Sequence, residues 1–178
     1  MPFNMSKYAS QHYPVAMGGK VVEMSAEQIG KLIKHRLLKS RAVLKNLQEF
    51  EIDPQRLDEL QIMIGPLDSM YAQTDAEKMI INKNLFDGGH FFEQYFFIIP
   101  HELIHWMSRI KEQDAWFNDP EEVLGFVASV AYEIEIGSTL DEIWNKVYPK
   151  VSWHFNDELD ASEFFRRMVE KAKKMLQN

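Results

Sequence analysis

The segment HELIH at residues 101–105 places two histidines four positions apart, with Glu102 next to the first of them. Side chains four residues apart lie one turn apart on the same face of an α-helix, so a helix brings both imidazoles within reach of one cation. Apolar residues follow the opposite side of the segment at helical spacing; they are Leu103, Met107 and Ile110. The pattern predicts an amphipathic helix that runs to about Lys111. It begins or kinks at Pro100, because proline has no backbone N–H to donate.

Histidine, glutamate and histidine in this order form the HExxH pattern, in which the histidines bind zinc and the glutamate acts as a base. We therefore expect His101 and His105 to be metal ligands. Zinc lowers the pKa of a bound water to about 7. Glu102, which does not bind the metal, would take a proton from this metal-activated water as the general base. The alternative interpretation is a surface helix with two ordinary histidines.

The residues after His105 distinguish between classes of zinc site, because a catalytic zinc usually has three protein ligands. The extended pattern HExxHxxGxxH would need glycine at Ser108 and histidine at Lys111. A cysteine ligand is excluded, because the chain has no cysteine. A glutamate on a following helix remains.

Glu122 is the preferred third ligand, with 16 residues between it and His105. Gly125 and Ser129 share its helix face, and their small side chains would let this helix approach the helix of HELIH closely. Glu122 is also open to a purely structural interpretation as the partner of Asp119 in a capping box. The alternative third ligands are Glu121, Glu133, Asp119 and Asp141.

The other periodic segments predict an α+β fold that is mostly helical, with a small sheet of about three strands beside the helix of HELIH. The predicted strands are short apolar runs at 60–64, 69–73 and 78–85. Ser25 and Gln28 are predicted to form a capping box for a helix that continues to about Phe50. Further helices are predicted at 119–136, at 138–148 with caps at Ser138 and Asp141, and at 161–176 with caps at Asp160 and Glu163. Residues 1–24 are predicted to be an extended N-terminal segment.

Length, charge and composition limit the remaining possibilities. A chain of 178 residues favours a single domain over residues 1–178. The net charge of −7 argues against a nucleic-acid partner, because phosphate contacts need clustered Lys and Arg. No apolar run approaches the roughly 20 residues of a membrane-spanning helix, so no membrane association is expected. The lack of cysteine is typical of a reducing compartment, and a cytoplasmic location is expected.

Three segments carry a resemblance to a known family: the isoleucine-rich stretch before HELIH, HELIH itself, and Glu122-Val-Leu-Gly-Phe-Val-Ala. Together, over about residues 78–136, they resemble the zincin metallopeptidases, and most closely the compact gluzincins of the ImmA/IrrE-like kind. The alanine–asparagine pair that usually follows the ligand glutamate is absent here. The resemblance implies an edge strand that binds substrate in extended form, for which 79–84 is the candidate. It also implies a side chain that stabilises the oxyanion of the tetrahedral intermediate in peptide hydrolysis. The candidates are Tyr132, Tyr148 and His154.

The leading hypothesis is zinc-dependent hydrolysis of a peptide or protein substrate, with Zn2+ held by His101, His105 and Glu122. One alternative is a protein of zincin fold that regulates or binds a partner with little proteolytic activity. The other is a helical interaction protein, in which HExxH is fortuitous and the basic segment 20–49 docks on an acidic partner. A further hypothesis is that residues 1–24 occupy the cleft as an inhibitory segment.

Overall fold

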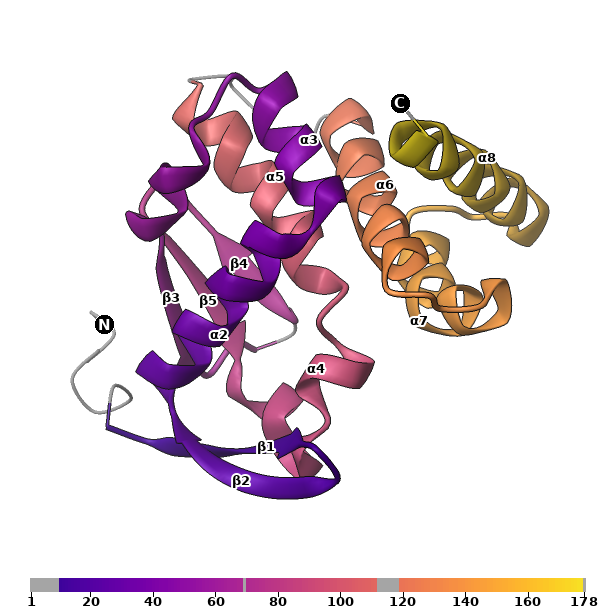
Figure 1. Cartoon of the computed structure of the whole chain (residues 1–178). Coiled ribbons are helices and arrows are strands. Elements are labelled where there is room, and N and C mark those ends of the chain that lie inside the picture. The colour runs from indigo at the N-terminus through magenta and orange to yellow at the C-terminus, as the bar shows by residue number, and fades with distance from the viewer. Residues whose placement is uncertain (1–9, 69, 112–118, 178) are drawn as a thin grey trace.

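The computed structural model describes residues 10–68, 70–111 and 119–177, and these form a mostly helical α+β arrangement (Figure 1). The strands of this part of the chain are β1 (His12–Met17), β2 (Lys20–Ser25), β3 (Gln61–Gly65), β4 (Ala72–Thr74) and β5 (Lys78–Asn82). Its α-helices are α2 (Ala26–Lys39), α3 (Arg41–Glu49), α4 (Phe91–Gln94), α5 (Ile98–Ile110), α6 (Asp119–Glu135), α7 (Leu140–Ser152) and α8 (Glu158–Gln177). Short 3₁₀ helices are η1 (Pro54–Asp58) and η2 (Lys83–Gly89).

The predicted sheet is present, with the strand order β3-β5-β4. β3 and β5 are parallel, whereas β4 is antiparallel to β5, with Gln73 opposite Ile80. The prediction that 79–84 forms the edge is therefore wrong: β5 is central, and β4 forms an edge of the sheet. Met79 and Ile81 are fully buried. The apolar character that suggested a binding strand instead reflects a central position, in which Met79 and Ile81 pack into the core while Ile80 is half-buried on the other face.

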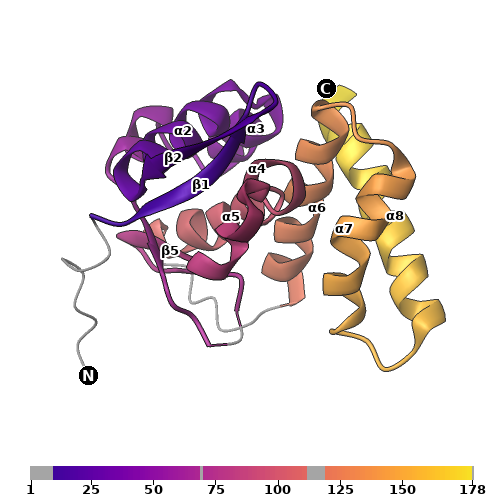
Figure 2. The same cartoon turned by 90° about the horizontal axis from the view of Figure 1, so that it is seen from below.

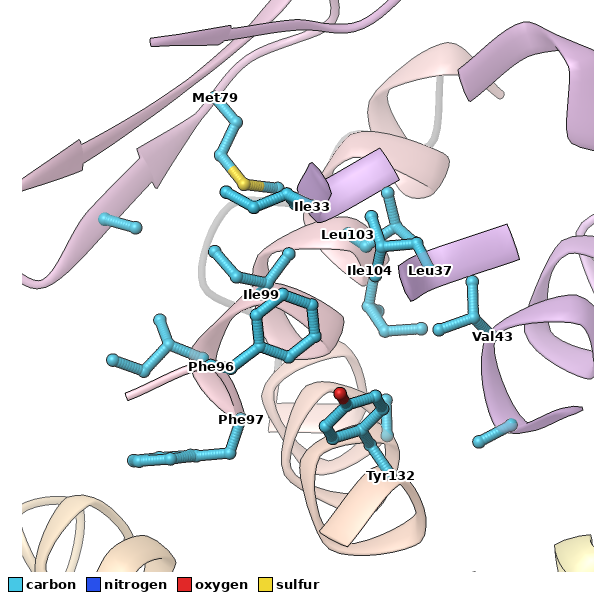
Figure 3. Packing of buried hydrophobic residues seen from close by; sticks show 14 of the residues in the cluster. Ile33, Leu37, Val43, Met79, Phe96, Phe97, Ile99, Leu103, Ile104 and Tyr132 are labelled. Atoms are coloured by element: carbon cyan, nitrogen blue, oxygen red, sulfur yellow. The ribbon is translucent and has the colours of Figure 1, made fainter. Parts of the chain in front are cut away.

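One hydrophobic core joins the sheet to the helices that surround it. Ile33 and Leu37 of α2 lie with Met79 of β5 and with Leu103 and Ile104 of α5 (Figure 3), and all five side chains are fully buried. On the other side of α5, the helices α6, α7 and α8 pack together as a group (Figure 2). α5 is thus held between the sheet and α6.

In the N-terminal part of the chain, the segment predicted to be extended at 1–24 contains two β-strands. Residues 1–9 lie outside the described part, and β1 and β2 pair as an antiparallel hairpin. Gly18 and Gly19 form its turn with φ values of 57° and 79°, which glycine adopts without the steric penalty of a side chain. Tyr13 and Val15 are buried, and the hairpin packs against η2 and α2.

The predicted helix from Ser25 to Phe50 is two helices, although its capping box of Ser25 and Gln28 is confirmed. The chain breaks at Ser40, whose side chain accepts a hydrogen bond from the backbone of Val43 and caps α3. Glu135, at the end of α6, accepts hydrogen bonds from the Ser40 hydroxyl at 2.7 Å and from the backbone N–H groups of Arg41 and Ala42. The break depends on a residue 95 positions away in the sequence. The local spacing of apolar residues cannot predict such a contact.

The caps of the last two helices also differ from the prediction. Thr139 and Glu142, one residue after the predicted pair, form the capping box of α7. This helix continues past Tyr148 to Ser152. α8 begins at Glu158 rather than at 161, because the Asp157 carboxylate accepts hydrogen bonds from the first backbone N–H groups. Among the described helices, none has the length and apolar character needed to cross a membrane.

Candidate metal centre

α5 presents HELIH to a cavity of about 510 Å³. Pro100 lies in the first turn of α5, where backbone N–H groups have no partner within the helix, so proline is tolerated there. Leu103 and Met107 are fully buried on the core side, as predicted, while Ile110 is half-buried. The opposite face carries His101, Glu102 and His105 into the cavity wall.

The two histidines converge on Glu122 of α6. One carboxylate oxygen of Glu122 lies 3.3 Å from His101 Nε2, and the other lies 3.3 Å from His105 Nε2. Ligand atoms about 2.0–2.1 Å from a tetrahedral zinc ion are about 3.3–3.4 Å apart. Each histidine therefore lies about as far from a carboxylate oxygen of Glu122 as two ligands of one zinc ion would lie from each other. His101, Glu102 and His105 also offer possible ligand atoms within 4.8 Å of one another.

Glu121, an alternative third ligand, contacts Nδ1 of His105, the ring nitrogen that does not face Glu122. Its Oε1 lies 2.5 Å from His105 Nδ1, and only 10% of the Glu121 side chain is exposed. A carboxylate on one imidazole nitrogen fixes the orientation of the ring and leaves the other nitrogen as the metal-binding atom. Adjacent glutamates in the sequence thus occupy different positions: Glu122 lies between the two Nε2 atoms, and Glu121 orients His105.

Two small residues of α6 let this helix approach α5, as the sequence predicts for Gly125 and Ser129. A Cβ atom at Gly125 would lie 2.7–2.9 Å from ring atoms of His101, closer than Cβ atoms are found in proteins. The Ser129 hydroxyl donates a hydrogen bond of 2.7 Å to the backbone carbonyl of Phe97, just before α5. Glycine is required at 125 because the imidazole of His101 occupies the space of a side chain.

Glu102 is held by the edge strand of the sheet. The hydroxyl of Thr74 in β4 donates a hydrogen bond of 2.8 Å to Glu102 Oε2. Carboxylate and imidazole atoms of Glu102, His101 and His105 lie within 4.8 Å of one another, so Glu102 is close enough to act on a molecule at the same centre. Thr74 is a residue that sequence reasoning missed, because a single threonine in a short strand carries no recognisable pattern.

The charges of the cluster favour a cation at its centre. Burial lowers the pKa of His105, but hydrogen bonds with Glu122 and Glu121 and the charge of Glu102 outweigh this effect and raise the pKa to about 9. Burial raises the pKa of Glu122, but hydrogen bonds with His101 and His105 outweigh it and hold the pKa well below its usual range. Three carboxylates thus surround two imidazoles, and a divalent ion would offset two of the three negative charges.

The other candidate ligands lie elsewhere. Glu133 is buried and forms an ion pair of 2.8 Å with Lys146 and a hydrogen bond of 2.6 Å with the Ser138 hydroxyl. Asp141 is exposed in the first turn of α7 and does not line the cavity. The side chain of Asp119 lies outside the described part of the chain. Of the described acidic candidates, only Glu121 and Glu122 contact the histidines.

One of the three oxyanion candidates borders the cavity. His154 lines it, and its ring packs against Phe126, which in turn contacts the ring of His101 at a centroid distance of 4.7 Å. Tyr132 is buried in the core against Phe96. Tyr148 stacks on Trp144, on the side of α7 that faces α8. Both tyrosines are therefore structural.

The outer wall of the cavity includes residues that the sequence did not single out. Tyr71 at the start of β4, Lys150 in the last turn of α7 and Trp153 just after it come together there. They are far apart in sequence, and only the fold brings them together. The hairpin residues 10–24 do not line the cavity, so the hypothesis of an inhibitory segment at 1–24 is wrong for its described part.

Comparison with protein-family models, with curated proteins and with solved structures finds no match to this chain. Inference about function therefore depends on the chemistry of the site.

Proposed function

We propose that this protein is a zinc-dependent metallopeptidase of the gluzincin type, with a zincin-like fold. The observation that carries the proposal is the convergence of His101 Nε2 and His105 Nε2 on Glu122, at 3.3 Å from each, beside the carboxylate of Glu102. His101, His105 and Glu122 would hold the ion. When bound, zinc would polarise the scissile carbonyl and make a water molecule more acidic.

The side chains of this cavity have distinct roles in such a reaction. Glu102 accepts the proton of the attacking water and later donates it to the leaving amine. Thr74 supports this role, since its hydrogen bond to one carboxylate oxygen orients the other. Glu121 keeps His105 in one orientation. His154, on the cavity wall, is the donor available for the oxyanion of the tetrahedral intermediate.

A peptide substrate is favoured by the strand beside the centre. β4 has β5 on one side, and no described strand pairs with its other side. The three residues of β4 all line the cavity. An extended peptide would add to this free edge through backbone hydrogen bonds, which brings its carbonyl groups past the centre at Glu102.

The test combines metal content with hydrolysis. Zinc is measured by mass spectrometry in the purified protein, and cleavage is measured on a mixture of unstructured peptides. We expect about one zinc per chain and cleavage that a chelator abolishes. Glu122→Gln should lose most of the zinc, whereas Glu102→Gln should keep the zinc and lose at least about 100-fold in kcat/KM.

Glu163→Gln, on the exposed face of α8, is the matched control and should behave as the wild type. A wild-type protein that binds no zinc when zinc is supplied would overturn the proposal. Full hydrolytic activity in Glu102→Gln would also contradict it. Loss of zinc in Glu102→Gln but not in Glu122→Gln would assign the third ligand to Glu102 instead.

A further inference from the structure

We infer that Lys150 forms a subsite for a carboxylate of the substrate, on the C-terminal side of the bond that is cleaved. This inference rests on the proposed peptidase function and names the class of peptide that the same site prefers: peptides with a free C-terminal carboxylate or an acidic side chain shortly after the cleaved bond.

Lys150 is a half-buried cation whose contacts are aromatic rings. Its Nζ lies 2.8 Å from the centre of the Tyr71 ring and 4.4 Å from that of Trp153. Within the described residues it has no carboxylate partner. Lys146, one turn earlier on α7, differs in this respect, because it pairs with Glu133 at 2.8 Å. A cation on the cavity wall without a counter-ion is suited to an anionic group of a ligand.

The solvation of Lys150 supports the same interpretation. Burial lowers the pKa of Lys150 to about 8. The protonated form still predominates at neutral pH, but it has lost hydration and has gained no ion pair in return. A bound carboxylate would supply this missing interaction, and hydrogen bonds to charged groups are among the stronger ones in proteins.

The direction of the substrate follows from the free edge of β4. The Tyr71 carbonyl accepts from Asn82 N–H, and Asp75 N–H donates to the Lys78 carbonyl. Residues 71, 73 and 75 therefore face β5, and the backbone groups of 72 and 74 face the free edge, because pairing alternates along an antiparallel ladder. A peptide added antiparallel to β4, the slightly more stable pairing, begins near residue 74 and ends near residue 71.

The ends of β4 have different neighbours. Thr74 contacts Glu102, the proposed base. Tyr71 contacts Lys150. The part of the peptide that follows the scissile bond therefore approaches Lys150. Arg109, the other Lys or Arg among the described lining residues, is exposed and follows His105 by one turn of α5.

The experiment compares matched peptides with the full-length zinc-loaded protein. One cleaved peptide is made with a C-terminal carboxylate or amide, and separately with Glu or Gln at the second position after the cleaved bond. The two pairs distinguish a terminal carboxylate from an acidic side chain. We expect kcat/KM to be at least about tenfold higher for the acid member of one pair, with the difference mainly in KM.

Lys150→Met should abolish this preference, and Lys150→Arg should retain most of it. Lys173→Met, on the exposed face of α8, is the matched control and should leave the preference unchanged. Equal kcat/KM for both members of both pairs would overturn the inference, and so would a preference that survives in Lys150→Met. A preference for acidic residues before the cleaved bond that disappears in Lys150→Met would reverse the proposed direction.

A binding measurement separates failure of this inference from failure of the peptidase proposal. Trp153 lies in the cavity wall, so its fluorescence can report peptide binding to Glu102→Gln, which is not expected to turn over. If the wild type cleaves no peptide, tighter binding of the acid peptide that is lost in the Glu102→Gln, Lys150→Met double variant still supports a carboxylate subsite. Equal Kd values for acid and amide overturn it.

Discussion

At the scale of single residues, Gly125 is the position where the centre tolerates least change. In the interior of a helix, replacing glycine by alanine is usually stabilising by about 0.5–1 kcal/mol. Here the new Cβ would lie 2.7–2.9 Å from the His101 ring, so His101 or α6 must move. We predict that Gly125→Ala weakens zinc binding by about 10- to 100-fold, measured by competition with a metal indicator.

Leu124→Ala is the control for Gly125→Ala, because Leu124 precedes it on α6 with 42% of its surface exposed. This variant should bind zinc as the wild type does. Unchanged zinc affinity in Gly125→Ala would mean that the close packing of α6 on His101 is not needed by the centre.

Lys150 makes the stability of the protein depend on pH in a defined window. Its folded-state pKa is lowered to about 8 by burial, below the unfolded value of about 10.4. A group with a depressed pKa contributes stability above its unfolded pKa, and this contribution is lost as the pH falls through the folded pKa. We predict that Lys150→Met gains stability relative to the wild type as the pH is lowered from about 10 to 8.

The difference in the free energy of unfolding between the two proteins is measured by urea titration at several pH values between about 7 and 10, roughly the span of the two pKa values. Below about pH 8 the difference should become constant. A difference that is independent of pH over the whole range would show that Lys150 titrates alike in the folded and unfolded chain.

At the scale of elements, the junction between α2 and α3 depends on Glu135 of α6. Its carboxylate accepts hydrogen bonds from the Ser40 hydroxyl and from two backbone N–H groups at the start of α3. Loss of a helix cap costs about 1–2 kcal/mol. We predict that Glu135→Ala lowers the free energy of unfolding by about this amount in urea titrations, with zinc content unchanged. A loss of zinc of the same extent would show that this end of α6 also positions Glu122.

The edge strand β4 gives a backbone test of peptide binding. The N–H of Ala72 faces the free edge, and proline is tolerated on such edges because that N–H is not used within the sheet. We predict that Ala72→Pro lowers kcat/KM for peptides by at least about tenfold, the equivalent of one lost hydrogen bond, and keeps the zinc. Gln73→Ala, which removes an exposed side chain from the same strand, should have little effect; equal loss in both variants would argue against strand addition.

What the sequence could predict about these elements is local. HELIH, the box of Ser25 and Gln28 and the three short strands depend on neighbours within a few positions, and the structure contains all of them. The different positions of Glu121 and Glu122 could not be predicted, because a shift of one residue on a helix decides which carboxylate lies between the Nε2 atoms. Thr74, Lys150 and the break at Ser40 depend on contacts between distant segments, and no local pattern encodes them.

At the scale of the whole molecule, the cavity joins two groups of elements. The sheet edge and α5 form one side, while α6 and α7 form the other. His101 and His105 belong to α5, and Glu122 belongs to α6, which packs closely on it. α6 holds two carboxylates against histidines at the surface of α5, so part of the cohesion between the two groups is electrostatic. A bound ion would connect them directly.

Zinc should therefore stabilise the whole fold. A ligand that binds only the folded state adds about 4 kcal/mol at a free concentration 1,000 times its Kd. For a chain of this length, this corresponds to an increase in Tm of roughly 8–16 °C. We predict such an increase between chelator and saturating zinc, measured by calorimetry. Glu122→Gln should show a much smaller increase, because one of the three ligands is lost. Equal Tm values with zinc and with chelator in the wild type would mean that the ion does not join α5 to α6.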